Sequence, residues 1–336
     1  MPTKKITLEE IAHMAGVSIA TVSRVINQNG RFSKETEKRV NEIIAKYNYR
    51  PNQMARGLRK NRGKVVGIIV PDVTNEFFAK MALEMQNRLL NEDYMAIICN
   101  TNESGDIERA HLSMLKSMLV SGLIYITHES IDTNHTLIVP TIYIDREPLC
   151  ISSQEENVFI ESENTEGGRQ AVRHLVDQGC RRIALVCLEG QISSHHNRCE
   201  GYKRGLRESG ISVDESLIYC TKAVTYEDGF EVTDELLREH PDVDGIFYTA
   251  DILALGALQY CLKRNVNVPE DLKIIGFDDI AACTRSIPQL TTIHQSVDMI
   301  AELAVKNLVS MMDGNPVEKS YIKFPINVVV RGSTQL

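Results

Sequence analysis

The sequence lacks a run of about 18 apolar residues, the length that a membrane-spanning helix requires. Its first residues, MPTKKITLEE, place a polar side chain every few positions and contain no apolar signal core. We therefore expect a cytoplasmic protein with no membrane contact. The eight cysteines include no C-x-x-C pair, which excludes a locally built zinc ribbon or thioredoxin-type motif. Buried, reduced thiols are the expectation in that compartment.

Common enzyme motifs are also absent. No G-x-G-x-x-G follows a strand, and neither G-x-S-x-G nor H-E-x-x-H occurs. Asp278 and Asp279 are adjacent, which points them to opposite sides of a strand end and argues against a shared acid/base pair. His195, His196 and Cys199 lie close together, but further ligands at useful spacing are missing, so a polar loop is favoured over a metal site. We expect no enzyme, no cofactor and no metal.

Length and charge indicate a folded protein of several parts. The chain has 336 residues, 24% of them charged and 43% hydrophobic, which predicts two or three folded domains. Residues 1–64 hold 14 Lys and Arg against five Glu and no Asp, although the whole chain has a net charge of −8. A basic module on an acidic body is typical of a DNA-binding head, and a basic solvated face is the alternative.

The basic module has the pattern of three short helices. Thr7 and Glu10 form a capping-box pattern before an apolar helical face. Gly16 ends that helix, and Ser18 is a second N-cap before IATVSRVIN. A third helix is expected from Ser33 to about Tyr47. This is a helix-turn-helix head, whose second helix enters the major groove of DNA with its N-terminal residues leading.

The second helix supplies the expected DNA contacts. Arg24 can bond guanine O6 and N7 together, or it can bind a phosphate instead. The other predicted contacts in the head are Ser18, Ile19, Ala20, Thr21, Ser23, Asn27 and Ser33. Of these, Ile19 and Ala20 can only read thymine methyls or pack close to the duplex. Ser18 and Thr21 have the alternative of capping their helix or touching phosphate.

From residue 65 the pattern changes to short apolar strands with helices between them. The expected strands are 65–70, 94–99, 122–126, 141–144, 182–188, 245–249, 273–277 and a final INVVVR, with helices at 76–91, 106–119 and 296–313. This rhythm predicts βαβ units in two parallel-sheet lobes divided near residue 163. A small ligand would bind between them, at the carboxyl ends of the strands.

Four stretches carry a resemblance that covers essentially the whole chain. They are LEEIAHMAGVSIATVSRVIN, YNYRPNQMARGL, IIGFDDI and PQLTTIHQ. In order and spacing they resemble the LacI/GalR family of bacterial transcription regulators. The resemblance implies a periplasmic-binding-protein-like body. The predicted parts of the chain are a head at 1–50, a hinge at 51–63, a first lobe of the body at 64–163 and 293–322, and a second lobe at 164–292 and 323–336.

The resemblance also assigns roles in the hinge. It implies a short helix that folds on operator DNA and inserts a leucine into the minor groove at a central CG step. Leu58 is then the wedge and Ala55 faces the partner helix, while Asn52, Arg56 and Arg59 lie near phosphates. An apolar wedge of this kind kinks DNA toward the major groove. From composition alone, RKNRGK has the alternative of a basic linker that reads no DNA.

The predicted effector site combines residues at strand ends with residues at matched family positions. Asp145 and Asp278 end strands and can accept hydrogen bonds from hydroxyls, and Arg198 supplies a bidentate fork. Phe77 and Phe78 match a family position at which an aromatic ring stacks on a sugar, or they are plain core aromatics. The matched set is completed by Asp251, Gln295, Arg146 and Asn75. Each carboxylate has the alternative of capping a helix or pairing with a base.

Three residues depart from the family pattern near this site: Glu76, Ala250 and Ile252. They leave the effector unidentified.

We expect a homodimeric repressor that binds a palindromic operator in double-stranded DNA and responds to a small effector, a sugar or sugar phosphate. The chain shows no heptad tail, which argues against a coiled-coil tetramer. The alternative is a small-molecule-binding protein or enzyme whose basic head makes another contact.

Overall fold

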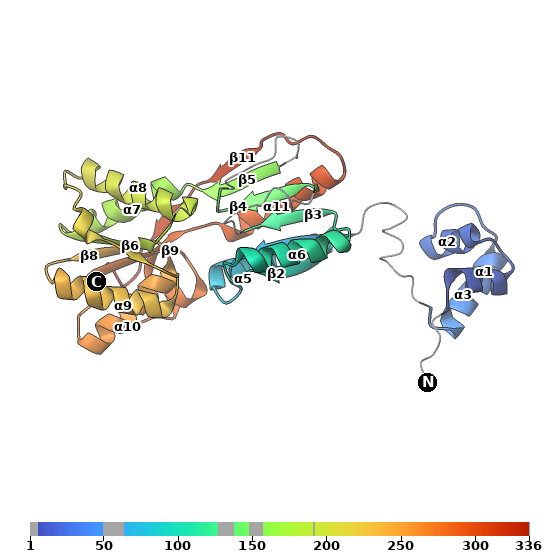
Figure 1. The fold of residues 1–336 in the computed structure, drawn as a ribbon, viewed down its shortest axis with the longest axis horizontal. Helices are drawn as coiled ribbons and strands as arrows, with labels where there is room; N and C mark the ends of the chain where they lie inside the picture. Colours follow the sequence, from blue (N-terminus) through green and yellow to red (C-terminus); the bar gives the residue numbers. More distant parts are fainter. Residues whose placement is uncertain (1–5, 50–63, 127–137, 148–156, 191, 336) are drawn as a thin grey trace. The chain divides into compact units, whose positions relative to one another are not determined.

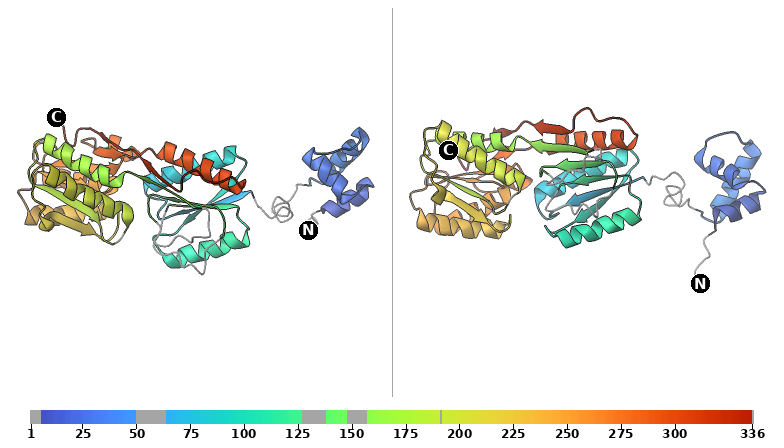
Figure 2. Two further views of the ribbon diagram at one scale, coloured as in Figure 1. Left: turned by 90° about the horizontal axis from the view of Figure 1, so that it is seen from above. Right: turned by 45° about the horizontal axis from the view of Figure 1, so that its top comes forward.

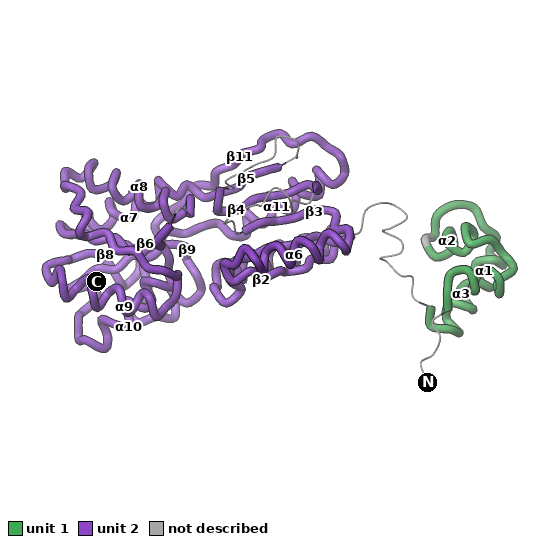
Figure 3. Tube along the Cα trace, in the orientation of Figure 1, with its two compact units in different colours: residues 1–63 green, residues 64–336 purple. Residues whose placement is uncertain are grey.

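The computed structural model describes residues 6–49, 64–126, 138–147, 157–190 and 192–335 (Figure 1). The chain divides into two compact units, residues 1–63 and 64–336 (Figure 3). The predicted hinge, 51–63, lies outside the described residues. We describe each unit by itself.

The first unit is the predicted three-helix head, with helices α1 (Leu8–Ala15), α2 (Ile19–Asn27) and α3 (Lys34–Lys46). The capping box is present: Thr7 Oγ1 accepts from the backbone N–H of Glu10, whose carboxylate accepts from the N–H of Thr7. Gly16 ends α1 with a φ of 65°, a conformation that glycine adopts at little cost. The buried side chains that close the small core are Ile11, Ala12, Ala15, Val22, Val25 and Val40.

The first lobe of the second unit is a six-stranded parallel sheet in the order β11-β5-β4-β3-β1-β2. Its elements are β1 (Val65–Val70), α5 (Glu76–Asn91), β2 (Met95–Asn100), α6 (Gly105–Ser117), β3 (Gly122–Tyr125), β4 (Thr141–Ile144), β5 (Asn157–Ser162), α11 (Val297–Met312) and β11 (Tyr321–Phe324). Figure 2 shows α11 (red) and α6 (green) on opposite sides of this sheet. Because helices cover both faces, β1 is buried at almost every position.

The second lobe repeats this order as β12-β10-β9-β8-β6-β7, with only β12 antiparallel to its neighbour. Its elements are α7 (Asn164–Asp177), β6 (Ile183–Leu188), α8 (Ser193–Glu208), the 3-10 turn η1 (Glu215–Leu217), β7 (Ile218–Thr221), α9 (Tyr226–Glu239), β8 (Gly245–Tyr248), α10 (Asp251–Arg264), β9 (Lys273–Asp278), the 3-10 turn η2 (Ala281–Thr284), β10 (Thr291–His294) and β12 (Asn327–Val329). The prediction of two parallel-sheet lobes is confirmed.

Helices α7 and α8 pack with their backbones in contact. A Cβ on Gly168 would lie 2.1 Å from the carbonyl oxygen of Arg198, and one on Gly201 would lie 2.1 Å from that of Thr165. Only glycine permits this approach. It fixes α8 firmly against α7 and so places Arg198 at the edge of the sheet.

Two of the lobe boundaries in the structure differ from those predicted from the sequence. The chain passes between lobes after β5, as the bound at 163 implies. It passes again after β10, which pairs with β9 through His294, so the predicted bound at 293 cuts this strand. The third passage follows β11, which pairs with β5 through Phe324, so the bound at 322 also falls inside a strand. An apolar run marks a strand but not the sheet that receives it.

Among the described helices, none is long and apolar enough to cross a membrane.

Candidate functional site

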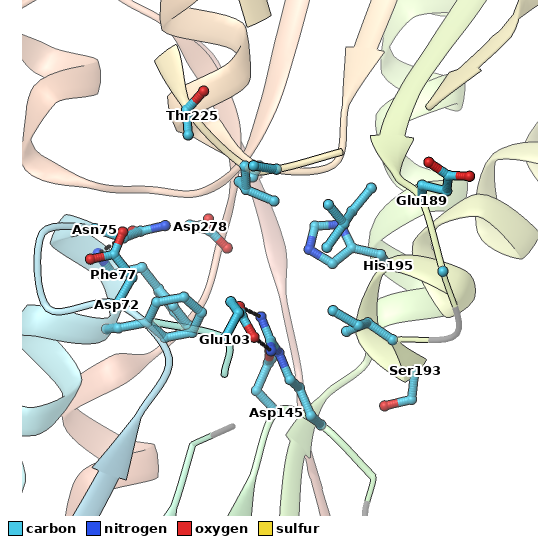
Figure 4. Close-up of a pocket in the computed structure, with 18 of the residues that line it drawn as sticks. Asp72, Asn75, Phe77, Glu103, Asp145, Glu189, Ser193, His195, Thr225 and Asp278 are labelled. Atoms are coloured by element: carbon cyan, nitrogen blue, oxygen red, sulfur yellow. Dashed lines mark hydrogen bonds and ion pairs between the residues drawn. The ribbon is translucent and has the colours of Figure 1, made fainter. Parts of the chain in front are cut away.

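A cleft of about 620 Å³ opens between the two lobes of the second unit. It is formed by residues at and after the carboxyl ends of the strands of both sheets, where open α/β sheets bind ligands (Figure 4). Seven of the nine predicted effector residues line it: Asn75, Phe77, Phe78, Asp145, Arg146, Arg198 and Asp278.

Arg198 is the centre of the cleft's polar network. Its Nη2 lies 3.5 Å from Asp145 Oδ1 of the first lobe, and its Nη1 lies 3.6 Å from Asp278 Oδ1 of the second. The guanidinium also donates to Asn164 Oδ1 at 2.8 Å and to the carbonyl of Thr249 at 2.7 Å. All three ionisable side chains are buried. Arg198 therefore links one carboxyl group of each lobe within the cleft.

Asp278 is held by its backbone and by Gln295. Its φ of 124° is rare for a residue other than glycine. Gln295 Nε2 donates to Asp278 Oδ1 at 2.8 Å. Burial raises the pKa of the Asp278 carboxyl well above its usual range, and the nearby Arg198 opposes that shift. Gln295 does not line the cleft; it positions Asp278 from behind.

Positive backbone φ angles gather around the cleft. Asn102 and Glu103 after β2 have φ of 50° and 56°, and Asp145 after β4 has 66°. With Asp278, four cleft residues other than glycine adopt this uncommon conformation. Such strain concentrates at ligand-binding sites, where the surrounding structure fixes polar side chains in one direction.

A second ion pair lies on the first-lobe side. Arg146 binds Glu103 with both ends of its fork, each N···O distance being 2.9 Å. The same guanidinium lies over the ring of Phe78, 5.7 Å from its centroid. Phe78 meets Phe77 edge to face at 5.4 Å, and Asn75 caps α5 by accepting from the N–H of Phe77. The aromatic pair is thus part of the cleft wall and of the core at once, because Phe77 is buried.

Asp251 lies elsewhere than predicted. It does not line the cleft, and its side chain has no exposed surface. Its carboxylate accepts from the N–H of Ile280 at 3.0 Å, from Thr292 Oγ1 at 2.5 Å and from Cys283 Sγ at 3.1 Å. Asp251 therefore joins the start of α10 to the segments around β9 and β10.

The cleft also contains residues that the sequence analysis missed. His195 was expected in a polar loop, but it lies buried in α8, with Nδ1 2.9 Å from Thr249 Oγ1. Burial and the neighbouring Arg198 and Arg146 lower its pKa well below the usual value. The other missed polar residues are Asp72, Asn102, Glu103, Glu147, Glu189, Ser193, Lys222 and Thr225. Most follow strands at the same edge, which is the signal that could have found them.

No group of three or more His, Cys, Asp or Glu side chains suited to a metal occurs among the residues that the structure describes.

In the head, the predicted contacts lie on and around α2. Ser18, Ala20 and Arg24 are exposed, and Ile19, Thr21 and Ser23 are partly exposed. Ser18 caps the helix by accepting from the N–H of Thr21, and the two hydroxyls lie 2.9 Å apart. Ser33 caps α3 in the same way. Asn27 ends α2, but its side chain is outside the described part, as are Asn52, Ala55, Arg56 and Leu58 of the hinge.

Comparison with known proteins agrees with both units. Residues 7–52 match the family "Bacterial regulatory proteins, lacI family", and residues 172–334 match the "Periplasmic binding protein-like domain". The ribose operon repressor of Halalkalibacterium halodurans is 31% identical over 98% of this chain and 97% of its own length. The chain belongs to the LacI family.

Two solved structures of regulators match nearly the full chain of this LacI-family protein. The Lac repressor dimer bound to operator and the anti-inducer ONPF matches with a TM-score of 0.85 and 26% identity, covering 98% of this chain and 99% of that one. The transcriptional regulator CelR in complex with cellobiose matches with a TM-score of 0.73 and 28% identity, covering 98% and 99%. This LacI-family chain is a DNA-binding transcriptional regulator.

The three departures from the LacI-family pattern now have positions. Ala250 is buried in the cleft wall just before α10. Ile252 packs partly buried against the core and does not line the cleft. Glu76 begins α5 in the first lobe, and its carboxylate accepts from the N–H of Ala282 in the second lobe at 3.1 Å. A further interlobe bond joins the N–H of Glu147 to Ser193 Oγ at 2.8 Å.

Proposed function

We propose that this protein is a homodimeric transcriptional repressor whose head reads a palindromic operator and whose cleft binds a sugar that changes operator affinity. The observation that carries the proposal is the bridge from Arg198 to Asp145 and Asp278, one carboxylate from each lobe. A ligand bound at this bridge contacts both lobes, so it changes the free energy of lobe closure. A coupling of about 1 to 3 kcal/mol between the two sites is sufficient for regulation.

The charge of the cleft favours an uncharged sugar over a sugar phosphate. Apart from Asp278, whose pKa is raised, five described lining residues are acidic and three are basic: Asp72, Glu103, Asp145, Glu147 and Glu189 against Arg146, Arg198 and Lys222. Both arginines already bind carboxylates, and Lys222 is exposed. A phosphate monoester adds about −1.5 to −2 charges at pH 7, so it would have to displace these pairs. Hydroxyls, by contrast, can donate to the carboxylates already in place.

A dimer accounts for apolar side chains at one edge of the first lobe. Strand β2 ends the sheet, and α5 and α6 both pack beside it. The exposed apolar residues on these three elements are Leu83, Leu90, Met95, Ile98, Ile107 and Met114. Apolar side chains gathered on an edge strand and its neighbours are typical of an interaction surface. A second copy would cover them, and it would supply the second head that a palindrome requires.

The cleft is proposed to bind its ligand without transforming it. Asp145 and Asp278 both lie against Arg198, so neither is placed alone beside a proton that it could transfer. We place the protein in the cytoplasm, where bacterial DNA is accessible to it.

Two linked measurements test the proposal. Selection from a pool of random duplexes, followed by fluorescence anisotropy, should recover a palindrome that is bound more tightly than scrambled DNA at every salt concentration. Affinity should fall steeply with salt, because bound Lys and Arg release counterions from the phosphates. Equal binding of palindrome and scrambled DNA would refute a regulator and favour the alternative of a binding protein with a basic head.

The second measurement is thermal unfolding against matched pairs of sugars and their phosphates. A ligand at 100 times its dissociation constant adds about 2.7 kcal/mol of stability. We expect stabilisation by one uncharged sugar and none by its phosphate. Stabilisation by the phosphate alone would contradict the charge argument while leaving the regulatory function intact.

A further inference from the structure

Two cysteines of the second lobe lie side by side on neighbouring strands. Cys187 on β6 and Cys220 on β7 are partners in the parallel register, and their Sγ atoms are 3.3 Å apart. Neighbouring strands lie about 4.8 Å apart, which is within the Cα separation of about 4.4 to 6.8 Å that a disulfide needs. The two sulfurs would have to approach by only about 1 Å to reach the bonded distance. We propose that Cys187 and Cys220 form a reversible disulfide, so that this lobe carries an oxidation site beside its ligand cleft.

The two thiols differ in exposure, which sets the order of reaction. Five of the seven described cysteines are buried, as expected from the sequence, but Cys199 is only partly buried and Cys220 is exposed. Cys220 lies on β7, the edge strand of its sheet, and so meets an oxidant in solution first. Cys187 is buried in the core, and burial together with the contact to Cys220 raises its pKa. It therefore acts second.

The chemistry balances with a peroxide as the oxidant. The Cys220 thiol loses its proton and attacks one peroxide oxygen as the thiolate. The O–O bond breaks, Cys220 becomes a sulfenic acid, and the leaving hydroxide takes up the released proton to form water. The sulfur of Cys187 then attacks the Cys220 sulfur, the S–O bond breaks, and a second water leaves with the proton of Cys187. The two thiols lose two electrons, and the peroxide is reduced to two waters. Cytosolic thiol systems reverse the bond, so it is a transient state rather than a structural one.

The position of the pair connects oxidation to the cleft. Each cysteine lies just before a segment that lines the cleft: Leu188 to Gly190 at the end of β6, and Lys222 to Thr225 after β7. These strand ends already bond each other through Glu189 N–H to the carbonyl of Thr221 at 2.8 Å and through Thr221 Oγ1 to the carbonyl of Cys187 at 3.3 Å. A covalent link one residue earlier would restrain both segments together.

The experiment treats the reduced full-length protein with hydrogen peroxide and maps its peptides without reductant. The expected result is a cross-linked peptide pair containing Cys187 and Cys220, and a fall in titratable thiols from eight to six. Cys220→Ser changes an exposed edge residue, so it should fold and lose the cross-link. Cys99→Ser changes a buried cysteine of the first lobe and is the matched control that should keep it. Addition of dithiothreitol should restore all eight thiols.

Other outcomes overturn the proposal. Cys199 packs on the same cluster as Cys187, so a bond from Cys199 to either partner would refute the assigned pair. Overoxidation of Cys220 without a cross-link would refute the resolving role of Cys187. Hydrogen exchange tests the connection to the cleft: residues 188–190 and 222–225 should exchange more slowly after oxidation of the wild type but not of Cys220→Ser. Unchanged exchange in the cross-linked protein would refute that connection.

Discussion

Glu76 and Ala282 lie 206 positions apart in the sequence and are joined by a hydrogen bond of 3.1 Å across the two lobes. Glu76 is the first residue of α5, and Ala282 lies in η2, beyond the end of β9. The bond runs beside the cleft rather than through it. It therefore joins the two lobes through residues that do not line the cleft.

We predict that Glu76→Pro weakens effector binding by about threefold, because a hydrogen bond of this kind contributes about 0.5 to 1.5 kcal/mol. Proline is favoured at the first position of a helix, and Asn75 has the extended backbone, with φ of −76° and ψ of 120°, that a following proline prefers. Calorimetric titration with the sugar found by thermal unfolding measures the change.

The melting temperature without ligand should stay close to that of the wild type, since α5 keeps its cap at Asn75. Glu84→Pro, in the interior of the same helix, should instead destabilise the fold and so separates helix damage from loss of the interlobe bond. An unchanged affinity in Glu76→Pro would refute a role for Glu76 in closure.

We predict that Arg198→Lys lowers effector affinity at least tenfold. A lysine keeps the positive charge but loses the planar fork that reaches Asp145, Asp278 and Asn164 together. Thermal unfolding with and without the sugar provides the readout.

Arg204→Lys is the matched control, because Arg204 lies on the same helix but is exposed and pairs only with Glu208 among the described contacts. It should leave affinity unchanged. Equal affinities for wild type and Arg198→Lys would place the sugar away from the arginine bridge.

The cleft shows which site residues strand patterns can predict and which they cannot. Asp278 ends the buried strand β9, and Asp251 follows the buried strand β8 as the first residue of α10; Asp278 was predicted from its strand end and Asp251 from its family position. The positive φ of Asp278 accompanies a carboxylate in the cleft, whereas Asp251 starts a helix and accepts from an internal amide and hydroxyl. That difference depends on the backbone conformation of single residues and on partners far along the chain. The hydrophobic periodicity of the sequence indicates neither the backbone conformation nor the distant partners.

The head was more predictable because its determinants are local. The caps at Thr7, Ser18 and Ser33 act within three residues; Thr7 and Ser18 were predicted as caps, and Ser33 was predicted as the start of the third helix. The points at which the chain crosses between lobes were less predictable. Strands β10 and β11 are each four residues long, and the sheet to which each belongs depends on pairing with distant strands. His195 was missed for the same reason: its hydrogen-bond partner Thr249 follows β8, 54 positions along the chain.

We predict that stability falls as the pH drops below about 6.5, and that His195 causes part of this fall. The pKa of His195 is lowered in the folded protein, so below the unfolded pKa the unfolded chain binds a proton that the folded protein does not. The slope from one such group approaches about 1.4 kcal/mol per pH unit. Urea unfolding of wild type and His195→Gln between pH 5 and 7.5 should give curves that differ in slope, the variant losing less stability on acidification.

His196→Gln controls for the loss of an imidazole, because His196 is the adjacent residue and is exposed. Its curve should run parallel to that of the wild type. A His195→Gln curve that is also parallel would mean that His195 is protonated alike in both states.

We predict that Arg24→Ala relaxes operator specificity at one base pair of each half-site. Arg24 is exposed on α2, and its aliphatic part lies against Gly30, where a Cβ would come within 3.1 Å of Arg24 Cδ. A bidentate contact to guanine contributes about 1 to 3 kcal/mol of discrimination, so binding to the selected operator should weaken while binding to the operator changed at that pair should not. Anisotropy titrations on a set of single-base operator variants locate the pair. If Arg24 binds a phosphate instead, the loss will be uniform over all operators and the salt dependence will fall by about one counterion for each head.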